Sequence, residues 1–353
     1  MIDLTQLIRS ALDQGASDIH LTVGIAPVFR LHGRLTPQGS VKLTPEDTAA
    51  AAAELANEEQ LAVLRETGEV DFAASFKDMV RLRCNLFSQQ NHTALALRML
   101  PLRIPTAQEL KLPQVVIDQA DKPRGLILVT GPTGSGKSST LAALLDHINH
   151  TRDRHIITFE NPIEYIYHHD QCLVNQREIG ADTESFASGL RAALRQDPDV
   201  ILVGEMRDLE TISTAITAAE TGHLVFGTLH TKGAASTIDR IIDSFPPDQQ
   251  NQIRTQLADV LECVVSQALI PRIRGGRTAV FEVMVVNPAI KAMILQNKTF
   301  QISSAMQTGK RAGMQLLEDG LTDLVRRGEV KIEDAAEASD DPAAFRQRFM
   351  GRM

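Results

Sequence analysis

Apolar residues in the first hundred positions follow two different periods, which predicts a domain of mixed helices and strands. Apolar side chains at positions 4, 7, 8, 11 and 12 recur at the three- and four-residue steps of one helix face. A second helix is expected at Thr44, because Thr44 suits an N-cap, Pro45 the first helical position and Asp47 the third. The strands predicted here are 18–21, 28–35, 71–76, 79–87 and 95–99, with a turn at Gly33.

The pattern changes after a segment in which Pro101, Pro105 and Pro113 follow one another closely. Proline fixes its own φ and interrupts regular structure, so we expect a linker here. From Arg124 onward, short apolar runs alternate with helical stretches, which is typical of a parallel α/β sheet. A strand over 279–286 should be followed by helices. The predicted fold class is α/β, with domains at 1–100 and 113–353, a linker at 101–112 and a helical C-terminal part from about 287.

The composition narrows the class of protein without identifying it. Lys and Arg total 36 and Asp and Glu total 44, a net charge of −8, and an acidic chain is a poor candidate for coating nucleic acid or an anionic bilayer. The three cysteines include no C-x-x-C pair, which argues against a tetracysteine zinc site. No apolar run approaches the ~18 residues of a membrane-spanning helix, and the first residues lack the features of a signal peptide. We therefore expect a cytoplasmic globular protein.

One segment matches the phosphate-binding loop pattern G-x-x-x-x-G-K-[ST]. An apolar strand over 126–130 should enter this loop and a helix over 138–148 should leave it, which is the context that phosphate binding requires. The glycines let several backbone N–H groups point at one anion. Lys137 can reach the β- and γ-phosphates, and the Ser138 hydroxyl can bind Mg²⁺. The residues expected to bind ATP here are Gly131, Pro132, Thr133, Gly134, Ser135, Gly136, Lys137, Ser138 and Ser139.

Polar residues follow three predicted strands at the edge of the sheet where the loop lies. They are Glu160 after 155–159, Glu205 after 200–203 and His230 after 224–229. Each alone could be a cap or turn residue, but all three beside a phosphate loop favour catalysis, because ligands of parallel α/β sheets bind at this edge. Glu205 could hold Mg²⁺ through water or align the attacking water, and His230 could contact the γ-phosphate. Glu164, on the loop after the first strand, is a candidate general base.

The positions of the other histidines and arginines in the sequence argue against a metal site and favour solvated loops. His223 and His230 should lie at opposite ends of one strand, about 23 Å apart, so they cannot bind one metal ion. The histidine pair and aspartate at 168–170 are expected to form a solvated loop, because the sequence has no second metal-ligand motif that would complete a metal site with them. The arginines between 272 and 277 are expected in a solvated hairpin turn, with a nucleic-acid contact as the alternative.

Together these motifs resemble those of the secretion-superfamily ATPases, and more narrowly those of the type IV pilus retraction ATPases of twitching motility. The segments that carry the resemblance are Gly-Ala-Ser-Asp-Ile-His at 15–20, the loop at 131–138, Glu-Asn-Pro-Ile-Glu at 160–164, and the segments at 197–208, 221–231 and 313–315. The resemblance covers essentially the whole chain. It implies an N-terminal PAS-like domain joined to a RecA-like P-loop ATPase domain, and a homohexamer with ATP at the subunit boundaries.

The resemblance also implies roles for individual residues. Glu164 corresponds to the general base of the family's Asp box, and Glu205 to the Walker B acid. His230 and His223 both belong to the segment that the family uses as its His box. His223 and Glu160 are expected among the nucleotide-binding residues.

The same resemblance places Arg83 and Arg98 where family arginines of the N-terminal domain reach the phosphates, with Arg81 close by. The alternative interpretation is that they are exposed arginines of a strand.

The expected function is a hexameric Mg²⁺-dependent ATPase that drives pilus retraction. It would attach peripherally to the inner membrane through the pilus platform protein, and a paralogous motor ATPase is a further candidate partner. No nucleic-acid partner is expected. Pilus-extension and type II secretion ATPases are longer and usually carry a tetracysteine zinc element, which this chain lacks.

Two departures from the family pattern keep alternatives open. The first is Asn161, which replaces an aspartate of the Asp box. The second is the segment at 289–296, which reads Ala-Ile-Lys-Ala-Met-Ile-Leu-Gln, whereas the corresponding helix of the family has the sequence Ala-Ile-Arg-Asn-Leu-Ile-Arg-Glu. In the family, that helix is linked to retraction rather than to hydrolysis. An accessory or regulatory ATP-binding paralogue is therefore the main alternative, and an extension or type II secretion ATPase or a nucleic-acid motor is a weaker one.

Overall fold

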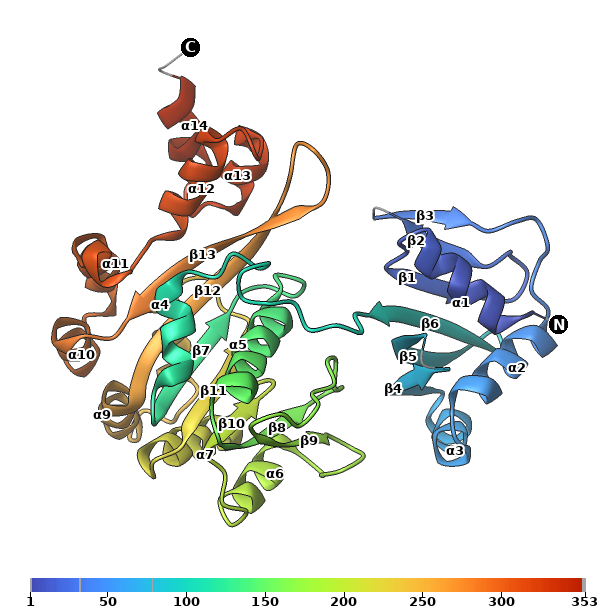
Figure 1. Cartoon of the computed structure of the whole chain (residues 1–353), viewed down its shortest axis with the longest axis horizontal. Helices are drawn as coiled ribbons and strands as arrows, with labels where there is room; N and C mark the ends of the chain where they lie inside the picture. The colour runs from blue at the N-terminus through green and yellow to red at the C-terminus, as the bar shows by residue number, and fades with distance from the viewer. Residues whose placement is uncertain (1, 32, 78, 351–353) are drawn as a thin grey trace. The chain divides into compact units, whose positions relative to one another are not determined.

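The computed structural model describes residues 2–31, 33–77 and 79–350. Their contacts divide the chain into two compact units (Figure 1). The first unit comprises Met1–Arg103 and Pro162–Ile166, and the second comprises Ile104–Asn161 and Tyr167–Met353. Each unit combines helices with one sheet, so the fold class is α/β, as predicted.

The first unit is a six-stranded antiparallel sheet whose helices share one apolar core with it. Its strands are β1 (Asp18–Leu21), β2 (Val28–Leu31), β3 (Arg34–Pro37), β4 (Glu69–Phe76), β5 (Val80–Gln89) and β6 (His92–Leu100), in the order β3-β2-β1-β6-β5-β4. Its helices are α1 (Leu4–Asp13), α2 (Pro45–Leu55) and α3 (Glu58–Thr67). Over the first eight residues of β5 the side chains alternate between buried and half-buried, as expected for a sheet with one face on the core.

The start of α2 follows from its sequence. The Thr44 hydroxyl accepts a hydrogen bond from the Asp47 N–H (3.3 Å), and the Asp47 carboxylate accepts one from the Thr44 N–H (3.0 Å). With Pro45 as the first helical residue, this capping box satisfies N–H groups that have no partner within the helix. The predicted helix start is confirmed.

The predicted strand at 28–35 is wrong as a single element. The chain forms two strands there, β2 and β3, which pair antiparallel with Val28 opposite Pro37. Gly33 has a φ of +82°, a conformation that other residues rarely adopt and that turns the chain back on itself. The turn residue was identified correctly, but the alternation of apolar residues at Phe29, Leu31 and Leu35 continues across it and hides the hairpin.

The second unit contains a seven-stranded sheet. Its strands are β7 (Gly125–Thr130), β8 (His155–Glu160), β9 (Leu173–Glu178), β10 (Val200–Val203), β11 (Leu224–Leu229), β12 (Leu261–Pro271) and β13 (Arg277–Val285). The strand order is β13-β12-β7-β11-β10-β8-β9, parallel except for the antiparallel pair β12 and β13. The helices along this part of the chain are α4 (Gln114–Ile117), the 3₁₀ turn η1 (Asp118–Asp121), α5 (Lys137–Thr151), α6 (Phe186–Ala193), α7 (Leu209–Glu220), α8 (Ala234–Asp243) and α9 (Gln250–Val260).

The central strands are buried along their whole length, which explains their continuous apolar sequences. Every residue of β7, β10 and β11 is buried, as is usual for parallel strands between covering layers. Two strands lie where the apolar pattern did not predict them. β9 is partly exposed and polar at its end, and β12 follows α9 without an intervening loop.

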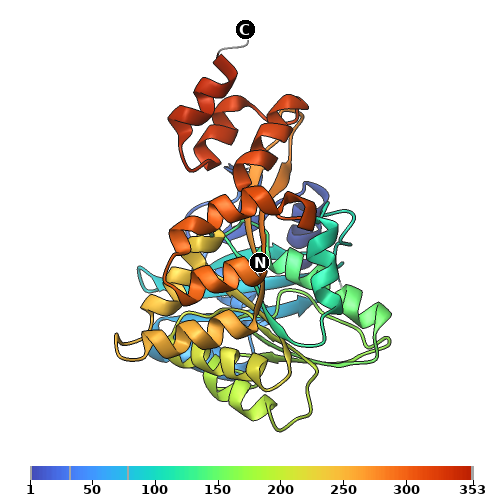
Figure 2. The same cartoon turned by 90° about the vertical axis from the view of Figure 1, so that its left-hand side faces the viewer.

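Helices follow β13, as predicted. They are α10 (Pro288–Leu295), η2 (Thr299–Gln301), α11 (Ile302–Thr308), η3 (Gly309–Ala312), α12 (Leu317–Arg326), α13 (Ile332–Ala338) and α14 (Pro342–Met350). Figures 1 and 2 show α12, α13 and α14 gathered around the outer end of the β12–β13 hairpin. A separate apolar cluster, which includes Ile270, Val280, Leu321 and Phe345, holds them there. These three helices are called the C-terminal helices below.

Burial raises the pKa of Cys84 and of Cys263 to about 12, so neither thiol ionises at neutral pH.

None of the helices in the described part of the chain combines the length and apolar character that a membrane crossing requires.

Candidate nucleotide-binding site

The predicted phosphate loop connects β7 to α5 at the carboxyl edge of the second sheet. A Cβ atom on Gly131 would lie 2.3 Å from the backbone oxygen of Gln267, and one on Gly136 would lie 2.7 Å from Nε2 of the same residue. Both glycines also have positive φ angles, +137° and +93°. The close approach of β12 therefore requires glycine at these positions.

Gln267 of β12 joins the loop to the helix that follows it. Its Nε2 donates to the Ser135 backbone oxygen (2.8 Å), and its Oε1 accepts from the Thr140 hydroxyl (2.7 Å). Gln267 is 4% exposed, so these hydrogen bonds are shielded from water. It lies 132 residues after Ser135, and no motif in the sequence indicated its role.

Lys137 folds back across the loop. Its Nζ donates to the backbone oxygens of Gly131 (2.7 Å) and Pro132 (3.1 Å), and its side chain is buried. These bonds hold a positive charge at the loop, beside the N–H groups of the first turn of α5. The next residue, Ser138, is exposed, so its hydroxyl is accessible to a ligand.

Two of the predicted strand-end residues meet. β10 and β11 are parallel neighbours with Val203 opposite Gly227, so Glu205 and His230 leave the sheet side by side. The Glu205 carboxylate accepts a hydrogen bond from Nε2 of His230, and the Arg207 guanidinium lies 2.5 Å from the same oxygen. The carboxylate thus lies between two donors, and β11, which ends just before His230, pairs with the strand that leads into the phosphate loop.

The third strand-end residue has partners within the sheet. Glu160 Oε1 accepts hydrogen bonds from the Thr158 hydroxyl (2.7 Å) and from Gln176 Nε2 (3.1 Å). Glu178, at the end of β9, is its register partner. Two carboxylates therefore end neighbouring strands at this edge.

His223 lies away from the loop within one chain. It precedes β11, beside Gly125 at the beginning of β7, whereas the loop begins at the other end of that strand. Its Nδ1 is 2.8 Å from the Ala218 backbone oxygen. The expected wide separation of His223 and His230 follows from this arrangement.

The remaining predicted site residues belong to the first unit. Glu164 lies in the segment Pro162–Ile166, where Arg81 Nε donates to the Ile163 backbone oxygen (3.0 Å). Arg83 and Arg98 are direct partners on β5 and β6. The Arg98 side chain is 60% exposed and also binds Asp18.

The two loops expected to be solvated are exposed except at Arg272, which is half-buried. The residues at 168–170 are exposed, and Nδ1 of His169 accepts a hydrogen bond from the Val174 N–H (3.1 Å). The arginines at 272–277 surround the β12–β13 turn, where Gly275 and Gly276 have positive φ angles.

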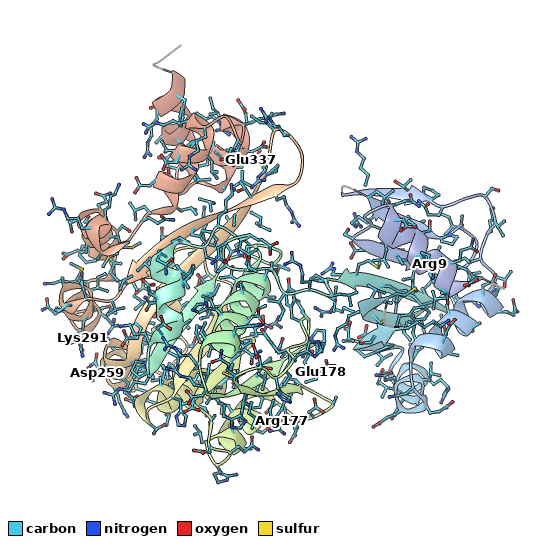
Figure 3. All side chains as sticks on the ribbon, viewed as in Figure 1. Arg9, Arg177, Glu178, Asp259, Lys291 and Glu337 are labelled. Carbon is cyan, nitrogen blue, oxygen red and sulfur yellow. The ribbon has the colours of Figure 1, made fainter. Side chains whose placement is uncertain are left out.

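A cavity of about 470 Å³ adjoins the phosphate loop within the second unit. Loop residues Thr133 and Gly134 form one wall, and β12 residues such as Leu269 form another. Asp334 and Glu337 of α13 complete it, and Figure 3 shows Glu337 among the C-terminal helices. A cavity beside a phosphate loop has room for the remainder of a nucleotide.

The sequence matches a family model described as "Type II/IV secretion system protein" over residues 1–337. It is similar to the "Type IV pilus retractation ATPase PilT" of Pseudomonas aeruginosa, with 46% identity over 98% of this chain and 100% of the relative. It is also similar to the "Twitching motility protein" of Neisseria gonorrhoeae, with 43% identity over 94% of this chain and 89% of the relative.

A solved structure has the same fold. The crystal structure of the pilus retraction motor PilT with bound ADP superposes with a TM-score of 0.90, at 48% sequence identity over 98% of this chain and 100% of that one. The similarity therefore extends over both units described above.

Proposed function

The chain belongs to the type II/IV secretion system protein family and is an ATPase, and on this premise we propose that its ATP hydrolysis drives the retraction of type IV pili. The observation that carries the proposal is the full-length similarity to a pilus retraction ATPase, combined with an intact phosphate loop. Nucleotide binding follows from the family, and the bound ADP of the similar structure supports ATP as the nucleotide.

We assign the phosphates to the loop and the rest of the nucleotide to the adjoining cavity. Lys137 would exchange one of its backbone acceptors for phosphate oxygens and offset their charge. Gly131–Ser138 would surround the phosphates with N–H groups, as the approach of β12 allows.

The oxygen donors at this edge suit Mg²⁺, which prefers hydroxyl, carboxylate and water ligands. Ser138 and, through water, Glu205 would hold it, and when bound it would neutralise phosphate charge. His230 and Arg207 orient the Glu205 carboxylate, which aligns the attacking water. Glu164 would accept the proton of that water as general base.

The assembly we propose is a homohexamer with ATP at the subunit boundaries. In it, a PAS-like domain (1–100) and a linker (101–112) precede a RecA-like domain (113–353). Arg83, Arg98 and His223 would act in nucleotide binding at these boundaries. The hexamer would sit on the cytoplasmic side of the inner membrane at the pilus platform protein, and a paralogous ATPase is a further candidate partner.

The alternative of an accessory paralogue rests on the altered helix at 289–296. This segment forms α10, and its Lys291 makes an ion pair with Asp259 of α9 (Figure 3). Lys291 thus keeps the positive charge of the family's arginine. Leu295, where the family has a second arginine, is 44% exposed. ATP binding without turnover by the purified protein would favour this alternative.

The proposal is tested by deleting the gene and complementing the strain with wild type, Lys137→Ala or Glu205→Gln. We expect the deletion to give many surface pili and no twitching, and only the wild type to restore motility. The purified Lys137→Ala protein should lose ATP binding, whereas Glu205→Gln should bind ATP and hydrolyse it at least about a hundredfold more slowly. A strain without pili would instead indicate extension, and normal turnover by Glu205→Gln would refute the site assignment.

A further inference from the structure

The loop that carries His230 is held at its far end by two buried side chains. The Gly233 N–H donates to the Ser266 hydroxyl (2.9 Å), and the Ala234 N–H donates to Glu282 Oε1 (2.8 Å). Ser266 and Glu282 are direct partners on β12 and β13. The hairpin therefore fixes the point at which this loop becomes helix α8.

The other carboxylate oxygen of Glu282 reaches the C-terminal helices. Oε2 accepts a hydrogen bond from the Leu317 N–H (3.4 Å), at the first residue of α12. A second link runs through Lys232, which lies in the same loop as His230 and donates to the Ser339 backbone oxygen (2.9 Å). The His230 loop and the C-terminal helices are thus joined at two separate points.

Glu282 is an unfavourable residue for packing alone. It is 8% exposed, and burial raises its pKa above the ordinary value, although the N–H groups of Ala234 and Leu317 act in the opposite direction. An apolar side chain would fill the same space in the hairpin without the cost of burying a carboxylate. What an apolar residue could not provide is two acceptor oxygens that bind two helix starts at once.

We propose that Glu282 is a positioning residue for ATP hydrolysis, which holds the His230 loop in place against Glu205 and couples it to the C-terminal helices. The inference rests on the roles proposed above for Glu205 and His230. Glu282 has no hydrogen bond to the phosphate loop among the described contacts. Glu282 does not itself line the cavity, although Leu317 and Lys232 do. Because the phosphate loop keeps its own hydrogen bonds, the loss of Glu282 should slow turnover more than it weakens nucleotide binding.

Glu282→Gln tests the proposal because the amide has the same size but only one acceptor oxygen. We expect kcat to fall about tenfold and the KM for ATP to stay within about twofold. Thr278→Val is the matched control, since it removes a buried hydroxyl on the same strand that binds Arg272 (3.2 Å) and not the loop. It should lower Tm comparably and leave kcat within about twofold.

Ser266→Ala is a milder second variant that removes the acceptor of the Gly233 N–H. Ser266→Ala should also lower kcat. In the double variant with Glu282→Gln, the fold-decrease in kcat should be smaller than the product of the two single decreases, because both residues hold the same loop. A Glu282→Gln enzyme with the kcat of Thr278→Val would overturn the proposal. If Glu282→Gln does not fold, an unchanged kcat of Ser266→Ala would do the same. Failure of the roles proposed for Glu205 and His230 would appear differently, as normal turnover by Glu205→Gln.

Discussion

At the scale of single residues, the phosphate loop depends on a side chain far away in the sequence. The loop itself supplies glycines and Lys137, but its shape is held by Gln267 through one donated and one accepted hydrogen bond. An apolar residue at this position would leave the Ser135 oxygen and the Thr140 hydroxyl without these partners in a buried environment.

Gln267→Leu is therefore expected to weaken ATP binding. Two hydrogen bonds at about 1 kcal/mol each correspond to a roughly tenfold to thirtyfold higher Kd, if most of the loss appears in the loop conformation that binds phosphate. Isothermal titration calorimetry with ATP measures this Kd. Gln119→Leu is the matched control, because Gln119 is equally buried but donates to the Val115 backbone oxygen, outside the loop. Equal affinities of the two variants would contradict the role given to Gln267.

At the scale of secondary-structure elements, Asp18 connects three neighbouring strands of the first unit. It lies on β1 and is the register partner of Arg98 on β6 and of Arg30 on β2. Its carboxylate accepts hydrogen bonds from Arg98 Nε (3.0 Å) and from the Ser17 hydroxyl (2.8 Å). Burial alone would raise the pKa of Asp18, but these hydrogen bonds and the charge of Arg98 outweigh it and hold the pKa below its ordinary value.

Asp18→Asn should lower stability in a pH-dependent way. Because the folded-state pKa is lowered, the ionised carboxylate stabilises the fold above the unfolded pKa of about 3.9, and this contribution disappears as the pH falls through the folded value. We expect a loss of about 1 kcal/mol at pH 7, since Arg98 is largely exposed, and a much smaller difference at acid pH. Thermal melting of the wild type and the variant at pH 7 and at acid pH measures this loss of stability. Asp71→Asn, which removes an exposed carboxylate of β4, is the comparison variant.

The elements also show what the sequence could predict. Local patterns were sufficient where neighbours along the chain determine the structure, as in the capping box at Thr44 or the strand, loop and helix around Lys137. They were insufficient for the hairpin at Gly33, where the alternation of apolar residues continues through the turn. They also could not identify Gln267 and Glu282, because a buried polar residue acquires its role from contacts that only the folded chain brings together.

At the scale of the whole molecule, the residues proposed for hydrolysis are divided between the two units. The phosphate loop, Glu205 and His230 belong to the second unit, whereas Arg83 and Arg98 belong to the first. Charges that develop on the phosphates are best offset by arginines fixed nearby. In a ring with ATP at its boundaries, those arginines can come from the neighbouring subunit, and subunit mixing distinguishes this arrangement from action within one chain.

The mixing experiment combines two inactive variants. Lys137→Ala subunits lack a working loop but keep both arginines, and the double variant Arg83→Ala, Arg98→Ala keeps the loop but lacks the arginines. If the arginines act on the neighbouring site, co-expressed rings contain complete sites wherever an arginine-deficient subunit meets a Lys137→Ala neighbour in the right order. Random mixing in equal amounts should then restore about a quarter of the wild-type ATPase rate. Arginines that act within their own chain would give no complete site, so mixed rings would be as inactive as either parent.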